Sequence, residues 1–361
     1  MSKSETPGGG GAGLRDGARP PTRPRSPTET RGSRAERGAG GRGLRPPGGG
    51  GLSLVLPKGS LEEQTLLLFR QAGLEVRGAD RSYDGTIRDP RIARVKVLRP
   101  QEIPNFVAQG HFDLGISGLD WVKESGLDLV KPGEARRLPP PGKGLVEVAD
   151  LGYSKGGPGP VRVVLAVPQA WGVKSLRKLR RRARISTEYP ALTRAYFERL
   201  GVPAEVVFSY GATEGKVPDL ADGVVDVTET GTTLRKAGLR IVETLVESTA
   251  LLLANPEAWR KKRRAILELR TLLLGVVEAR GKVLLVMNVP ADRLERVIRT
   301  LPAMKRPTVS PLYAPGGKAG AADYYAVETV VSRDEVNRLL PRLKGAGAED
   351  ILELRIEKIV R

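Results

Sequence analysis

The chain contains no cysteine and only one histidine in 361 residues. Disulfides, thiolate catalysis and cysteine-based zinc sites are therefore excluded. A histidine-rich metal site is equally impossible, and a Ser-His-Asp triad would have to use His111, which has no nucleophile motif beside it. We interpret His111 as a surface or hinge residue.

Long apolar runs and aromatic residues are also scarce. No stretch of eighteen apolar residues is free of charge, and the N-terminus lacks the apolar segment of a secretory signal. Together with the absence of cysteine, this predicts a cytoplasmic protein without a membrane partner. Aromatic residues make up 4% of the chain, which is too few for stacking platforms on single-stranded nucleic acid.

Positive charge is in excess, with a formal net charge of +19. Such an excess is typical of nucleic-acid-binding proteins, and that function stays open as an alternative that predicts strongly salt-dependent binding to DNA or RNA. We favour anionic substrates, because the excess is spread along the chain and no recognisable nucleic-acid-binding motif accompanies it. Nucleic acid is therefore not among the expected partners.

The order of predicted elements indicates an α/β protein with several domains. Residues 1–50 are rich in glycine, proline and arginine and lack aromatic residues, so we expect a disordered extension. Strands and helices then alternate, which favours mainly parallel sheets. The first helix follows a capping-box pattern, Ser60 with Glu63, and a long amphipathic helix is predicted at about 258–280. The predicted domains are a first lobe at 51–159 and 246–280, a second lobe at 160–245, and a β-α-β-β-α-β domain of ferredoxin-like type at 281–361.

The most informative segment is VVDVTETGTTLRKAGL at 224–239. Its β-branched residues predict a buried strand, and the Thr/Gly run predicts a hydroxyl-rich turn into a helix from Leu234. Such a turn presents backbone N–H groups, hydroxyls and a helix dipole to a terminal phosphate. Asp226 and Glu229 beside it suit sugar hydroxyls or a metal, so we predict a phosphorylated sugar as ligand. The alternative is an ordinary strand–turn–helix with Ser/Thr capping.

Seven segments occur in an order that is typical of one enzyme family and span nearly all of 52–361. They are LPKGSLEEQTL at 56–66, LRPQEIPNFV at 98–107, DLGISGLDWV at 113–122, ISTEYPALTRAYF at 185–197, SYGATEGKVPDL at 209–220, the turn at 226–234 and RPTVSPL at 306–312. The chain resembles ATP phosphoribosyltransferase in its long form, which has a C-terminal regulatory domain and performs the first step of histidine biosynthesis. Each segment alone is weak, but the set is specific.

The resemblance implies a fold and a reaction. Two lobes like those of a type II periplasmic-binding protein would enclose the active site, with the chain crossing between them more than once. The adenine N1 of ATP would attack the anomeric carbon of 5-phosphoribosyl 1-pyrophosphate and displace pyrophosphate, with Mg²⁺ accompanying that substrate. Histidine would inhibit through the third domain, and the protein would be a homo-oligomer, either a dimer or a hexamer.

The resemblance also assigns roles to individual residues. Catalysis would depend on positioning and fixed charge rather than on a covalent nucleophile, and Mg²⁺ would be held largely by substrate oxygens, so no protein metal ligands are assigned. The 5-phosphate would bind at Thr230, Gly231, Thr232 and Thr233, the ribose hydroxyls at Asp226 and Glu229, and the pyrophosphate at Lys58, Arg81 and Arg99. Gly118 and Asp120 would face the cleft, and Thr187 and Tyr189 would meet the nucleotide.

Several of these residues have simpler interpretations. Lys58 would then only neutralise a surface, Arg99 would pair with Glu102, Tyr189 would be a packed core aromatic, and Gly118 would serve turn geometry. A different function also stays open, a non-catalytic two-lobed protein that binds a small molecule. A solute receptor of that kind would carry an export signal and would have no need of TETGTT.

Asn288 and Thr308 mark the histidine pocket that the resemblance implies. One pattern of the family has an aspartate where Asn288 stands in this chain. A carboxylate would pair with the amino group of free histidine, whereas an amide can only hydrogen-bond to it. The amide at this position therefore leaves the strength of feedback inhibition undetermined by the sequence.

Overall fold

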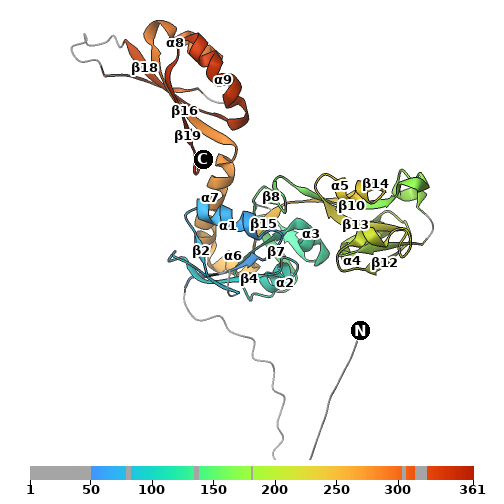
Figure 1. Ribbon diagram of the computed structural model, residues 1–361. Helices are drawn as coiled ribbons and strands as arrows, with labels where there is room; N and C mark the ends of the chain where they lie inside the picture. The colour runs from blue at the N-terminus through green and yellow to red at the C-terminus, as the bar shows by residue number, and fades with distance from the viewer. Residues whose placement is uncertain (1–49, 79–82, 134–137, 180–181, 303–305, 314–322) are drawn as a thin grey trace, which may run out of the picture. The chain divides into compact units, whose positions relative to one another are not determined.

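The computed structural model describes residues 50–78, 83–133, 138–179, 182–302, 306–313 and 323–361, apart from the side chain of Arg177. The predicted N-terminal extension, except Gly50, and Arg81 lie outside the described residues. Within the described part, three large sheets and one two-stranded piece organise the chain (Figure 1). Two α/β lobes followed by a ferredoxin-like domain confirm the predicted fold class.

The first lobe is an eight-stranded mixed sheet in the order β2-β3-β4-β1-β5-β15-β7-β6. β1 lies between the parallel strands β4 and β5, and all its residues are buried. Because side chains alternate between faces, Leu54 packs in one core cluster and Val55 in another. Both faces are covered, as is usual for parallel strands. The strands are β1 (Leu52–Pro57), β2 (Val76–Arg77), β3 (Asp84–Ile87), β4 (Ile92–Leu98), β5 (Leu114–Gly118), β6 (Asp128–Val130), β7 (Gly144–Asp150) and β15 (Ala250–Ala254), and the first three helices are α1 (Glu62–Gln71), α2 (Ile103–Ala108) and α3 (Leu119–Glu124).

The predicted helix at 258–280 is in fact two helices, α6 (Pro256–Lys261) and α7 (Arg263–Ala279). The break falls at Lys262, whose backbone is not helical, with φ −120° and ψ 20°. The amino group of Lys262 donates to the Asp113 carboxylate at 2.8 Å, so the break places a charge against the start of β5. In the described ranges no helix, α7 included, is long and apolar enough to cross a membrane.

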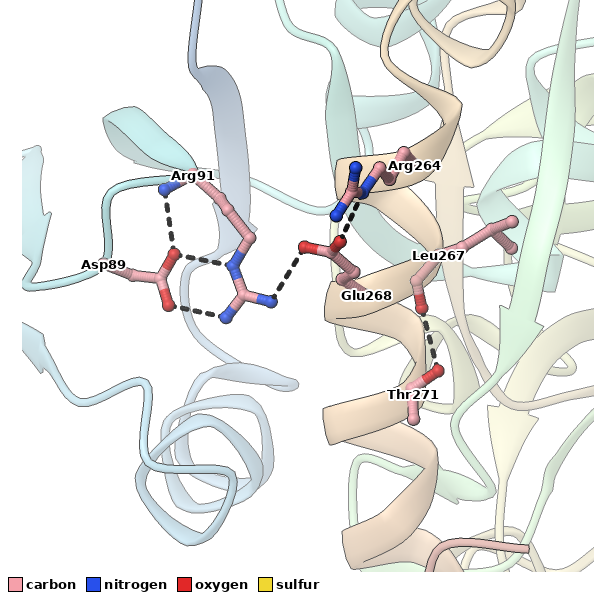
Figure 2. A network of polar contacts seen from close by, with 6 residues as sticks. All are labelled: Asp89, Arg91, Arg264, Leu267, Glu268 and Thr271. Atoms are coloured by element: carbon pink, nitrogen blue, oxygen red, sulfur yellow. Dashed lines mark hydrogen bonds and ion pairs between the residues drawn. The ribbon is translucent and has the colours of Figure 1, made fainter.

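Arg91 ties the connection between β3 and β4 to α7 (Figure 2). It donates two parallel hydrogen bonds to the Asp89 carboxylate at 2.8 and 2.6 Å, and its remaining nitrogen lies 3.5 Å from a Glu268 oxygen. The side-chain hydrogen bond from Arg91 outweighs burial and lowers the pKa of Asp89. Glu268 also pairs with Arg264, one turn earlier in α7, at 3.0 Å.

The second lobe is a five-stranded sheet in the order β12-β11-β13-β10-β14. The sequence analysis does not predict β14, which runs antiparallel to β10 along its whole length. Two irregularities in that pairing, at Val163/Val164 and at Leu165/Ala166, break the period-2 alternation by which a strand is recognised. The elements are β10 (Val161–Pro168), β11 (Ala183–Thr187), β12 (Ala204–Phe208), β13 (Gly223–Thr228), β14 (Leu239–Ser248), α4 (Pro190–Arg199), α5 (Thr232–Lys236) and the 3₁₀ turns η1 (Gln169–Trp171), η2 (Leu176–Lys178) and η3 (Thr213–Lys216).

The chain crosses between the two lobes twice. On the way out it forms a short hairpin from β8 (Tyr153–Ser154) and β9 (Gly157–Pro158) before entering β10. On the way back β14 leads directly into β15, with Thr249 between them. The two crossings therefore border the space between the lobes.

The C-terminal domain is a four-stranded antiparallel sheet in the order β17-β18-β16-β19. Alternate residues of β16, such as Leu285 and Met287, are buried against the helices, and the residues between them are only partly buried. One face of the sheet thus carries the helices. The elements are β16 (Lys282–Pro290), η4 (Ala291–Arg293), α8 (Leu294–Thr300), β17 (Thr308–Pro311), β18 (Tyr324–Ser332), α9 (Arg333–Ala346) and β19 (Glu349–Arg355).

One buried hydroxyl pair should contribute measurably to the stability of the first lobe. Tyr153 is fully buried and its hydroxyl lies 2.6 Å from that of Thr65, which also donates to the Leu61 carbonyl. Thr65→Val would leave the Tyr153 hydroxyl without this partner, at a cost of about 1–3 kcal/mol. We expect a lower urea midpoint for Thr65→Val than for Thr65→Ser, which keeps the hydroxyl.

Adding Tyr153→Phe to Thr65→Val removes both partners, and should recover part of the loss. Equal midpoints for Thr65→Val and Thr65→Ser would contradict a stabilising role of this hydrogen bond.

Candidate functional site

A cavity of about 250 Å³ lies between the two lobes. Its first-lobe wall is formed where three neighbouring strands end: Lys58 follows β1, Arg99 follows β4, and Gly118 ends β5. Its second-lobe wall includes Glu188 and Tyr189, which follow β11. Carboxyl ends of parallel strands meet at one edge of a sheet, which is where α/β proteins bind ligands.

Lys58 and Arg99 flank the same turn. The Lys58 amino group pairs with Glu62 at 2.9 Å, and the Gly59 N–H donates to the other Glu62 oxygen at 3.0 Å. Burial acts to raise the pKa of Glu62, but the hydrogen bonds from Gly59 and Lys58 and the nearby Arg99 charge outweigh it and lower that pKa. The predicted capping box of Ser60 and Glu63 is wrong, because Leu61 is the N-cap, without a side-chain bond, and Glu62 bonds to the turn.

Arg99 remains available to a ligand. One Arg99 nitrogen lies only 3.3 Å from the position that a Cβ on Gly59 would occupy. Among the described residues it forms no ion pair with Glu102, whose backbone N–H instead donates to the Arg99 carbonyl. The two cations therefore meet at one end of the cavity.

Asp120 and Tyr189 join the two lobes to each other. The Tyr189 hydroxyl donates to one Asp120 oxygen at 2.8 Å, and the Ser248 hydroxyl donates to the other at 2.6 Å. Tyr189 also stacks on Trp121, with ring centroids 4.4 Å apart. Burial, followed by the Asp120 charge, raises the pKa of Tyr189 well above its ordinary value. Both residues line the cavity, but their polar atoms already have partners.

Gly118 has a packing reason for being glycine. Its backbone is extended, with φ −70° and ψ 149°, so turn geometry does not require glycine. A Cβ at this position would lie 2.0 Å from an Asp120 oxygen. Any larger residue would displace the carboxylate that holds Tyr189.

A second cavity of about 270 Å³ adjoins the first and shares Lys155, Val161 and Val227 with it. Three of the predicted phosphate residues line it, namely Thr230, Thr232 and Thr233, together with Glu229, which is predicted to bind the ribose hydroxyls. Gly231 does not line it, but fixes the turn through its positive φ of 74° and through its N–H, which donates to the Thr228 hydroxyl at 2.9 Å. The helix after the turn, α5, begins at Thr232 rather than at Leu234.

Besides Gly231, two predicted substrate residues line neither cavity. Thr187 is fully buried and accepts a hydrogen bond from the Tyr189 N–H at 2.9 Å. Asp226 accepts hydrogen bonds from the Thr213 hydroxyl and from the Val227 N–H. Arg81 lies outside the described residues. Thr187 and Asp226 thus stand behind the cavity walls.

Lys155 is a functional candidate that the sequence analysis missed. It lies at the tip of the β8–β9 hairpin and lines both cavities. Within the described residues its side chain has no hydrogen bond or ion pair. The hairpin lies close against the phosphate turn, since a Cβ on Gly156 would be 2.0 Å from a Glu229 oxygen. The only sequence signal is a lysine before two glycines, which is weak.

The carboxylates at the two cavities suit a magnesium ion that arrives with a substrate. No cluster of three or more His, Asp or Glu side chains that would hold a metal occurs in the described part of the chain. Glu188 borders one cavity and Glu229 borders the other, whereas both Asp120 oxygens already accept hydroxyl hydrogen bonds. Mg²⁺ commonly uses one or two carboxylates together with phosphate oxygens and water. The donor set fits that mode.

Asn288 and Thr308 lie on the open face of the C-terminal sheet. Asn288 pairs in register with Ala326 of β18, and Thr308 pairs with Glu328 two residues further along the same strand. The Asn288 amide donates to the Asp350 carboxylate at 2.9 Å. A carboxylate therefore stands next to Asn288, although it comes from β19.

Known proteins are similar to this sequence. The family model described as HisG, ATP phosphoribosyltransferase, matches residues 99–275, and that of the HisG C-terminal domain matches 279–358. ATP phosphoribosyltransferases of Pelotomaculum thermopropionicum and Desulforudis audaxviator are each 43% identical to this chain over 86% of its length and 99% of theirs. The solved ATP phosphoribosyl transferase (HisG:HisZ) complex from Thermotoga maritima contains a chain with a TM-score of 0.50 and 26% identity, aligned over 63% of this chain and 98% of that one.

Asp226 should make the ligand-free protein less stable at neutral pH. Burial raises its pKa above the ordinary value, and the Glu188 and Glu214 charges raise it further, against the bonds from Thr213 and Val227. With a folded-state pKa above the unfolded one, the stabilising contribution is complete below the unfolded pKa and is lost as pH rises through the folded pKa. At pH 7 the ionised carboxylate therefore opposes folding.

Asp226→Asn should raise the thermal midpoint of the ligand-free protein at pH 7, and the gain should shrink toward pH 4. The Thr213 hydroxyl can then accept a hydrogen bond from the new amide. Asp219→Asn, at an exposed position in the same region, is the matched control and should leave the midpoint unchanged. A lower midpoint for Asp226→Asn at pH 7 would show that the carboxylate stabilises the fold.

Proposed function

The chain belongs to the ATP phosphoribosyltransferase family, and on that premise we propose that it transfers the phosphoribosyl group of 5-phosphoribosyl 1-pyrophosphate to N1 of ATP. The products are phosphoribosyl-ATP and pyrophosphate, in the first step of histidine biosynthesis. The observation that supports this most is the pair of adjoining cavities, one bordered by cations and one by a hydroxyl-rich turn. They match a ribose that carries pyrophosphate at one end and phosphate at the other.

The 5-phosphate occupies the cavity of the turn at 228–233. Backbone N–H groups and the hydroxyls of Thr230, Thr232 and Thr233 surround it. Glu229 lies at the rim of this cavity and accepts hydrogen bonds from the ribose hydroxyls. Asp226 lies behind the cavity wall, where it accepts hydrogen bonds from the Thr213 hydroxyl and the Val227 N–H.

The pyrophosphate occupies the end of the first cavity where Lys58 and Arg99 meet. As the N1 lone pair forms the new C–N bond, the C1–O bond breaks and its electron pair leaves with the pyrophosphate. Fixed cations close to those oxygens stabilise the developing charge without reorganisation. Lys155, at the tip of the β8–β9 hairpin, stands at the boundary of the two cavities and contacts the phosphate groups there. Arg81 is also assigned to the pyrophosphate. Magnesium bound to the pyrophosphate oxygens supplies further charge neutralisation when it is present.

ATP enters from the side of the second lobe. The stacked pair of Trp121 and Tyr189 offers an aromatic wall to the adenine, and the backbone next to Thr187 borders it. Because the Tyr189 hydroxyl keeps its proton, it stays a donor to Asp120. The lobe contact therefore persists while the nucleotide binds.

The predicted domain limits and the homo-oligomer remain part of this proposal. We assign 51–159 with 246–280 and 160–245 to the catalytic lobes and 281–361 to the regulatory domain. The subunits assemble as a dimer or a hexamer. The alternative of a non-catalytic receptor is not favoured. The relatives that align with 86% of this chain and with 99% of their own length are enzymes by name.

Histidine regulation is assigned to the open face around Asn288 and Thr308. In this chain the Asp350 carboxylate, 2.9 Å from the Asn288 amide, pairs with the α-ammonium group of histidine. The aspartate that one pattern of the family has at position 288 is thereby replaced by a carboxylate from the neighbouring strand.

The reaction is tested with purified protein, ATP, 5-phosphoribosyl 1-pyrophosphate and Mg²⁺, by following phosphoribosyl-ATP spectrophotometrically. The parent should form product. Thr232→Ala with Thr233→Ala should raise the KM for the phosphoribosyl donor by about tenfold or more, from two lost hydrogen bonds to a charged group, and leave the KM for ATP unchanged.

Thr271→Ala, on the exposed side of α7, serves as the control and should behave as the parent. Absence of product from a folded sample would refute the activity. An unchanged KM in the double variant would instead refute only the phosphate site.

The regulatory site is tested by histidine inhibition of the same reaction. Asp350→Asn should raise the histidine concentration for half-inhibition by about tenfold, because a charge-assisted hydrogen bond is lost. Turnover without histidine should stay at the parent value. Glu335→Gln, an exposed carboxylate on α9, is the matched control, and an equal response of the two variants would argue against a specific pairing with Asp350.

A further inference from the structure

A third cavity, of about 270 Å³, lies where the catalytic core passes into the C-terminal domain. We name it the junction pocket. Its wall comes from the ends of α1 and α7, the first residues of β16 and α9, and the end of β19. The residues that line it include Gln71, Arg280, Lys282, Arg333, Arg355 and Glu357.

Four cationic side chains and one carboxylate thus border the junction pocket. Lys282 is paired with Glu278, which lies one turn earlier in the chain. Arg333 and Arg355 form no ion pair with any described residue. Glu357 is the only acid on the wall formed by described residues. Two arginines of the pocket are therefore without a carboxylate partner among the described residues, although Lys282 is neutralised by Glu278.

Arg280 is the most constrained of these cations. Its guanidinium lies 5.4 Å from the centre of the Tyr153 ring, and one nitrogen donates to the Leu151 carbonyl at 3.3 Å. Burial lowers its pKa. A guanidinium has five N–H donors, and the described contacts use one. The other N–H donors of the partly buried Arg280 guanidinium are thus available to a ligand.

The proposed transferase reaction does not account for this pocket. Among the described residues, none that lines it also lines either cavity between the lobes. It also lies away from Asn288, which is near the other end of β16 from Lys282. Its cations therefore serve neither the substrates nor the proposed histidine site.

We propose that the junction pocket binds a small phosphate-type anion, namely inorganic phosphate or pyrophosphate. Planar guanidinium groups recognise phosphate oxygens through paired hydrogen bonds. Arg280, Arg333 and Arg355 approach from three different elements, so a ligand with three or four acceptor oxygens can satisfy all of them. A single carboxylate has only two oxygens and one charge, and so matches three guanidinium groups less completely than phosphate does.

The pocket is connected to the catalytic cleft by adjacent structure. Arg280 borders the pocket and contacts Leu151 and Tyr153. Tyr153 begins the β8–β9 hairpin whose tip carries Lys155 in the cleft. An anion that binds Arg280 therefore acts next to the base of this hairpin, and the hairpin carries Lys155, which we propose binds the substrate phosphates.

The test is isothermal titration calorimetry of the ligand-free full chain with inorganic pyrophosphate at low ionic strength. We expect two binding events for each chain, one in the cleft and one in the junction pocket. Arg333→Gln with Arg355→Gln should weaken one event by about a hundredfold, from two charge-assisted hydrogen bonds. Arg99→Gln should weaken the other. Titration with inorganic phosphate then identifies which of the two anions the junction pocket prefers.

The control is Arg338→Gln with Arg342→Gln, two exposed positions of α9 that remove the same charge elsewhere on the domain. This variant should keep both events. Equal loss in the control and the junction variant would overturn the proposal, as would two unchanged events in the junction variant. The single variant Arg355→Gln, at an exposed strand end, repeats the test if the double variant does not fold. A missing cleft event with an intact junction event would count against the proposed reaction alone.

Discussion

The structure depends on a buried carboxylate that two lobes share. Asp120 is 5% exposed and accepts hydroxyl hydrogen bonds from Tyr189 and Ser248. An ionised group removed from water is costly unless hydrogen bonds compensate it, so these partners cannot be separated freely. Tyr189 immediately precedes α4, and Ser248 ends β14. The Asp120 side chain therefore fixes both the facing wall of the cleft and the crossing back to the first lobe. Glu124 adds a second link by accepting the N–H groups at the start of α4.

This arrangement divides the polar groups of the cleft into two sets. Asp120, Tyr189 and Thr187 are satisfied by one another and hold the walls in place. Lys155 and the hydroxyl turn lie on elements that are fixed by close packing, as Gly156 against Glu229 shows, yet they retain free capacity for a ligand. Charge that is positioned before the substrate arrives stabilises a departing anion more effectively than charge that must reorient. The residues that hold the walls in place therefore keep Lys155 and the hydroxyl turn positioned for the ligand.

The sequence predicts features that follow from chain order, and fails where distant side chains pair. Lys58 and Arg99 meet because each follows one of two adjacent parallel strands, β1 and β4, and the turn after β13 is recognisable from its residues alone. By contrast, Tyr189 and Asp120 are 69 positions apart, and no local pattern reveals that they satisfy each other. Two irregularities hide β14, Lys262 interrupts a helix by reaching Asp113, and Lys155 has no motif. Its position follows from the packing of its neighbour Gly156 against Glu229.

Net charge is a poor indicator of function in this chain, and local charge is a better one. At physiological ionic strength, interactions fade beyond about 8 Å, so most of the +19 excess contributes little to the choice of a ligand. Cations matter where they line a cavity and have no carboxylate partner. Lys58 is held by Glu62 and contributes less free charge, whereas Arg99, Lys155 and the arginines of the junction pocket keep theirs. A chain of this kind selects phosphate through a few cations that its fold leaves unpaired, and the remaining basic residues are a solvated surface.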